Sequence, residues 1–162
     1  MAKSDSFFIR VSAPISDTFE QTAVDMGAYV DALGKSVVRL HRIEVQYNVG
    51  GRPIASAGFG FAQYNLTTQS QAAIVAMSDK SVVASGIFRQ STDGASYTLE
   101  NDSTDLGPQQ WTNGYLIGVE QLYVGTQCSA APFTGGSIDL VLECTVETLS
   151  QSAAMALALS QQ

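Results

Sequence analysis

The chain has 162 residues, a length typical of one domain with a buried core, and its charged fraction of 14% is below the roughly 25% of average domains. The formal net charge is −7, because residues 1–81 hold seven basic and seven acidic side chains whereas residues 82–162 hold one and eight. This balance disfavours a dedicated nucleic-acid binder. No stretch is apolar enough to span a bilayer, and the polar residues 1–6 predict no secretory signal.

Period-two alternation of apolar and polar residues is the main pattern, and it predicts β-strands. In chain order, the predicted strands are 7–12, 35–49, 55–64, 72–77, 82–88, 97–99, 115–124 and 137–149. Residues 115–124 are apolar at both parities, so we expect that strand to be central or covered on both faces. Turn-forming pairs such as Asn113-Gly114 punctuate the pattern. We predict an all-β fold: an antiparallel β-sandwich of about eight strands in a single domain, residues 1–150.

Two segments depart from the β pattern. Residues 17–33 fit neither template, and we expect a long excursion with one helical turn. Residues 151–162 form a C-terminal tail of high helix propensity that Ser150 or Ser152 would cap. Because an isolated helix of this length is unstable, we expect the tail to be either frayed or ordered by docking on a neighbouring subunit.

Residues suited to catalysis are few. The single histidine, His41, lies on a predicted strand among Arg39 and Ile43, which is typical of a packed or surface residue. Cys128 and Cys144 match no zinc or redox spacing, and Cys144 is expected to be a small buried hydrophobic residue. We therefore predict that the chain is not an enzyme and holds no cofactor.

Two weak ligand candidates follow from the sequence. Asp102 and Asp105 lie in an acidic segment that offers the oxygen atoms calcium prefers, although the segment lacks EF-hand spacing and a solvated acidic loop is the more common explanation. Trp111 and Tyr115 lie close together and are a candidate platform for a sugar, although such a tryptophan more often fills the end of a sandwich core. They support the alternative of a ligand-binding β-sandwich, such as a carbohydrate-binding or adhesion module.

The order of the segments resembles that of single jelly-roll viral capsid proteins, the eight-stranded sandwiches that tile icosahedral shells. The likeness covers a short N-terminal strand at 7–12, a long strand with mixed charges at 35–49, and a closing pair at 115–124 and 137–149 before a tail. It implies jelly-roll strand order, assembly of many copies into a shell, and a place in the virion.

One departure concerns the genome. Many such capsid proteins carry a long basic N-terminal arm, whereas this chain begins with only Lys3 and Arg10. Any contact with packaged nucleic acid would therefore need a local basic surface, for which Arg39, Arg42 and Arg52 are the candidates, or a separate packaging component. The leading expectation is a structural protein whose main partner is another copy of itself, because its neutral polar surface costs less to desolvate than a charged one. We expect no membrane contact.

Overall fold

The computed structural model describes residues 4–31, 35–48, 58–99, 109–129 and 133–162, and it confirms the all-β prediction. Helix α2 covers Gln151–Ser160 and follows the strands directly. The strands are β1 (Phe7–Pro14), β2 (Glu20–Asp25), β3 (Ser36–Asn48), β4 (Gly58–Thr67), β5 (Val82–Thr92), β6 (Tyr97–Leu99), β7 (Gln109–Ile117), β8 (Gln121–Cys128) and β9 (Ser137–Thr148).

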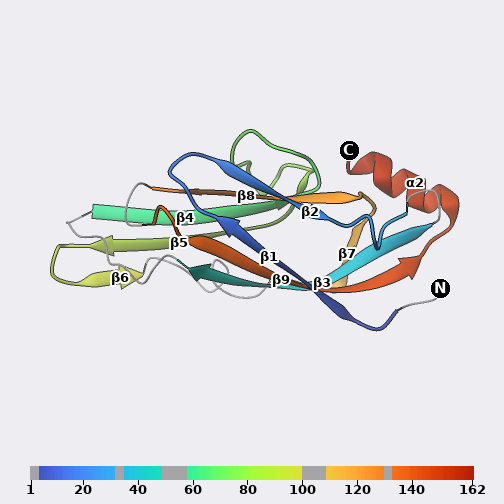
Figure 1. Cartoon of the computed structure of the whole chain (residues 1–162), viewed down its shortest axis with the longest axis horizontal. Coiled ribbons are helices and arrows are strands. Elements are labelled where there is room, and N and C mark those ends of the chain that lie inside the picture. Colours follow the sequence, from blue (N-terminus) through green and yellow to red (C-terminus); the bar gives the residue numbers. More distant parts are fainter. Residues whose placement is uncertain (1–3, 32–34, 49–57, 100–108, 130–132) are drawn as a thin grey trace.

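The nine described strands form two antiparallel sheets with the orders β1-β9-β3-β7 and β2-β8-β4-β5-β6. Apart from the short β6, the strands pair from the ends of the chain inward: β1 with β9, β2 with β8, β3 with β7 and β4 with β5. The β3–β9 and β4–β8 pairings complete the two sheets. This is the strand order of a jelly roll, which the capsid resemblance implies and which strand alternation alone does not determine. Figure 1 shows α2, in red, at the end of the sandwich where β1 begins.

Side chains of one parity from each sheet fill the core. On β9, Ile138, Leu140, Leu142 and Cys144 are at most 1% exposed, which confirms the apolar face predicted for this strand. Each buried Leu or Ile stabilises the fold by about 1.5–3 kcal/mol relative to leaving it in water. The alternation that predicts the strands therefore also supplies most of the driving force for packing the two sheets together.

The predicted strand at 72–77 was wrong. These residues form a loop whose backbone is held by side chains: the Val75 N–H donates to Asn65 Oδ1 at 2.9 Å, and the Gln71 N–H donates to Gln21 Oε1 at 2.8 Å. Because the side-chain oxygens of Asn65 and Gln21 accept these backbone hydrogen bonds, the segment needs no neighbouring strand, although its residues are apolar.

The single strand predicted at 115–124 was also wrong. The chain turns at residues 118–120, so β7 ends at Ile117 in one sheet and β8 begins at Gln121 in the other. Gly118 permits the turn to lie close to α2, because a Cβ at this position would lie 2.9 Å from Leu157 Cγ. Both parities are apolar because the inward face changes parity between the sheets.

Residues 17–33 hold an unpredicted strand, β2, as well as the expected helical turn. In that turn, the Val30 N–H donates to the Met26 carbonyl at 2.9 Å. Strand β2 is the edge of its sheet, and Val24, at 6% exposed, is its one buried residue. An edge strand with so few buried side chains leaves a weak alternation pattern.

The C-terminal tail is neither frayed nor in need of a neighbour to become ordered. Ser150 caps α2 as predicted, accepting a hydrogen bond from the Ala153 N–H. Beyond the helix, Gln161 is 6% exposed: its Oε1 accepts from the Gly118 N–H at 2.8 Å, and its Nε2 donates to the Leu116 carbonyl at 2.7 Å. The tail therefore docks on its own chain at the turn between β7 and β8.

Candidate functional site

Edge strand β7 carries a large bulge at residues 111–114. On the adjacent strand β3, Leu40 pairs with Tyr115 whereas Arg42 pairs with Gln110, so four residues of β7 lie opposite a single residue of β3. Bulges re-aim side chains and are common beside binding sites. This bulge displaces Trp111 from the regular ladder.

Buried charges and a glycine hold the bulge. Gly114 has a φ of +71°, and a Cβ at this position would lie 2.6 Å from Arg39 Cγ, so Asn113-Gly114 forms the bulge rather than a turn between strands. The Arg39 guanidinium donates to the Asn113 carbonyl through Nη1. It also donates to both oxygens of Glu147, at 2.7 and 2.8 Å, and these bonds raise the pKa of Arg39. Glu147 is 2% exposed, so the pair forms a largely buried anchor for β7.

A hollow of about 910 Å³ lies beside the bulge, lined by residues of β4, β5, β7 and the 74–77 loop. Trp111 and Tyr115 both line it, with ring centroids 6.1 Å apart and planes inclined by 51°. The structure therefore brings together the two aromatic residues that the sequence singled out. Both also pack against the core, so they have a structural role as well.

Tyr64 forms the buried part of the hollow. Its hydroxyl accepts a hydrogen bond from Gln109 Nε2 at 3.1 Å, and the same amide donates to the Ser85 carbonyl. Burial raises the pKa of Tyr64, so the phenol keeps its proton at physiological pH. Sequence reasoning missed Tyr64 and Gln109, because neither belongs to a motif and their proximity depends on how the two sheets close on each other.

A second hollow, of about 590 Å³, also has Trp111 in its wall, together with His41, Arg42 and Glu143. The partner of His41 is a hydroxyl, since its Nε2 lies 3.0 Å from Thr145 Oγ1. This arrangement gives the histidine a neutral neighbour rather than the orienting carboxylate that general-base catalysis commonly uses. The expectation that the chain is not an enzyme stays a prediction.

Sequence comparison finds no family model and no curated protein that matches the chain. The capsid resemblance therefore stays a prediction, and so does the alternative of a carbohydrate-binding module. The structure adds the geometry of the surfaces on which each of these functions would depend.

The predicted basic surface is partly neutralised. Arg39 is paired with Glu147, and Arg42 Nη2 lies 2.7 Å from Glu44 Oε1, with both of these side chains substantially exposed. Arg52 lies outside the described residues. The two described arginines therefore carry little uncompensated positive charge.

The predicted calcium candidates Asp102 and Asp105 also lie outside the described residues. Within the part of the chain that the structure describes, no group of three His, Cys, Asp or Glu side chains is placed to hold a metal ion. In that same part, no helix has the length and apolar character needed to cross a membrane.

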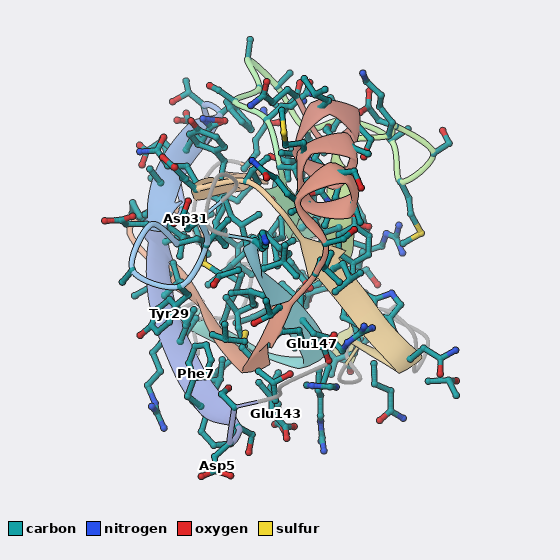
Figure 2. All side chains as sticks on the ribbon, turned by 90° about the vertical axis from the view of Figure 1, so that its right-hand side faces the viewer. Asp5, Phe7, Tyr29, Asp31, Glu143 and Glu147 are labelled. Carbon is teal, nitrogen blue, oxygen red and sulfur yellow. The ribbon has the colours of Figure 1, made fainter. Side chains whose placement is uncertain are left out.

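Helix α2 presents apolar side chains on two sides. Ala154 and Ala158 are buried on the chain's own domain, whereas Met155 and Leu159 are 44% and 69% exposed. None of its ten residues is charged. Figure 2 looks onto this end of the sandwich and shows α2 across the front of it, with Tyr29 lying near Phe7 to one side.

The outer faces of the two sheets differ in charge. Across the five-stranded sheet, one row of paired residues consists of Gln21, Gly125, Asn65 and Ser85, none of which is charged. Phe59 has the same parity on β4 and is 52% exposed. On the four-stranded sheet, β3 instead carries an exposed ion pair, between Arg42 and Glu44. On the five-stranded sheet, Asn65 is only 3% exposed and its Oδ1 holds the Val75 N–H, so the accessible part of that outer face lies toward Phe59.

Proposed function

We propose that this chain is a structural subunit that assembles with copies of itself into a shell, as a viral capsid subunit does, and that it resides in the virion. The outward side of α2 is the observation that carries the proposal. The jelly-roll strand order supports it, although lectin domains and cupins share that architecture. The partner that the proposal names is therefore a second copy of the chain, and its first contact is α2.

Met155 and Leu159 lie about one turn apart, on an exposed side of α2 about 100° around the helix axis from the buried Ala154 and Ala158. A helix that is apolar on all sides is typical of one that is covered on all sides. The chain's own domain covers one side only. Covering each exposed side chain in an interface would contribute about 1–2 kcal/mol, a part of the 1.5–3 kcal/mol of full burial.

The neutral face of the five-stranded sheet supports the same proposal. Interfaces exclude charge from their centres, and amide and hydroxyl groups can pair across them at low desolvation cost. At the exposed end of this face, Phe59 is 52% exposed and pairs across the sheet with Ser91. We assign lateral contacts between subunits to this face and to α2.

For the genome, the proposal favours a separate packaging component. Arg39 and Arg42 already have glutamate partners, so a phosphate group would have to compete with Glu147 and Glu44. Releasing counterions from nucleic acid requires free cations, and these two arginines supply few.

The test compares two pairs of substitutions on the same helix. The first variant, Met155→Lys with Leu159→Lys, places two positive charges on the proposed contact. The control, Ala153→Lys with Ser160→Lys, places two positive charges on exposed positions of α2 outside that contact. All four residues are exposed or half exposed, so both variants should fold. A helix turns about 100° per residue, which separates the two pairs around its axis.

The measurement is particle mass by size exclusion with multi-angle light scattering, followed by negative-stain microscopy. We expect shells or large oligomers from the unaltered chain and from the Ala153/Ser160 variant, and smaller species from the Met155/Leu159 variant. Equal assembly of both variants would remove α2 from the interface. A chain that stays monomeric at every concentration would overturn the proposal as a whole.

A further inference from the structure

The 910 Å³ hollow beside the bulge is lined by neither α2 nor Phe59, the exposed parts of the proposed assembly contacts, and it has the features of a binding site. Its volume lies within the roughly 300–1,000 Å³ of small-ligand sites. Aromatic and aliphatic side chains, among them Trp111, Tyr115 and Ile74, form much of its wall. An apolar wall with a few polar groups is the usual composition of a ligand pocket.

The polar groups of the hollow are mostly neutral amides and hydroxyls. The side chains of Gln63 and Gln110 and the indole N–H of Trp111 make no hydrogen bond within the described residues, and so their donors and acceptors are available. Amide groups both donate and accept, which matches the hydroxyl groups of a sugar. Arg89 is the one charged side chain that the described residues contribute to the lining.

From this lining, we propose that the hollow binds a neutral, polyhydroxylated ligand, namely a short segment of a glycan. The apolar face of a sugar ring would pack on Trp111 and Tyr115, and its hydroxyl groups would bond to Gln63 and Gln110. The site is rigid on one side, because Arg39 and Glu147 hold the bulge from which Trp111 projects. Preorganisation of this kind lowers the entropy cost of binding.

The predicted specificity follows from the charge of the lining. Arg89, the one charged side chain of the described lining, already has an interaction within the chain, so the carboxylate of an acidic sugar would have to compete for its guanidinium, whereas a neutral sugar would not. In a direct comparison, a neutral glycan should therefore bind more tightly than a sialylated one.

The chain itself supplies the probe, since Trp111 is its only tryptophan. Intrinsic fluorescence of the full chain is measured during titration with maltotriose, chitotriose and sialyllactose up to about 10 mM, the range of weak single-site binding. We expect a saturable change in Trp111 emission with a neutral trisaccharide and a weaker or absent change with sialyllactose. Stronger binding of sialyllactose would overturn the neutral class, and no response to any of the three would overturn the site.

Substitutions locate the binding. Gln63→Ala and Tyr115→Ala should each weaken binding at least about fivefold, which corresponds to about 1 kcal/mol. Gln46→Ala, an exposed amide on β3 outside the hollow, should leave affinity unchanged. If Tyr115→Ala fails to fold by circular dichroism, Gln63→Ala decides the matter, since Gln63 is a half-buried residue of the sheet. Equal affinities for the Gln63→Ala and Gln46→Ala variants would place the ligand elsewhere and overturn the proposal.

Discussion

Removing either partner of the Arg39–Glu147 pair should destabilise the whole sandwich and loosen the bulge. Glu147 is 2% exposed and Arg39 is 19% exposed, so a charge left without its partner is poorly solvated. Breaking such a pair costs about 3 kcal/mol, out of the roughly 5–15 kcal/mol by which domains are stable. We expect this loss for Glu147→Leu and for Arg39→Met.

Urea denaturation measures the loss. With a slope of about 2 kcal/mol per M, the transition midpoint should fall by about 1.5 M in each single variant. Trp111 emission is a suitable probe, and the Arg39→Met variant should also change it in the native state, because Arg39 holds the Asn113 carbonyl of the bulge.

A double-mutant cycle separates the ion pair from simple packing. The Arg39→Met, Glu147→Leu double variant leaves no buried charge, so it should be more stable than the sum of the single losses predicts, by about 2 kcal/mol. Single losses below about 0.5 kcal/mol, or strictly additive losses, would refute the reasoning that this pair is buried and coupled.

Three further outcomes follow from contacts elsewhere in the fold. Gln161→Ala should lower the free energy of unfolding by about 2 kcal/mol in urea titrations, because it leaves the buried Gly118 N–H without an acceptor; an unchanged midpoint would contradict the docking of the tail. Burial raises the pKa of Cys128, and that of Cys144 to about 12, so Ellman's reagent should find no reactive thiol in the folded chain and two in urea. Hydrogen bonds donated to its carboxylate lower the pKa of Asp79, so the stability it adds should be present above about pH 4 and lost on further acidification. Thermal melts of Asp79→Ala against the unaltered chain would show a difference that shrinks at low pH, and a difference that grows would contradict this.

The sheets were the predictable part of this fold, because alternation depends on local sequence. Strand β9 shows this best, since every second residue from Ile138 to Cys144 is apolar in the sequence and buried in the structure. The errors arose where contacts distant in sequence decide the structure. Residues 72–77 form a loop because Asn65 supplies an acceptor, and the turn at Gly118 is fixed by the tail more than forty residues later.

The candidate site was predictable only in part. Trp111 and Tyr115 are aromatic neighbours in sequence, and their proximity in the fold followed from that. The bulge did not follow, because it depends on the register between β3 and β7 and on the charge of Glu147, which arrives from β9. An acidic residue on a strand with an apolar face reads as solvent exposed, and here it is one of the most buried side chains.

The central claim is self-assembly, and the mass of the unaltered chain in solution tests it most directly. Multi-angle light scattering across a range of protein concentrations and salt should give particles of many times the 17.1 kDa subunit mass. A constant mass of 17.1 kDa under all of these conditions would contradict the account.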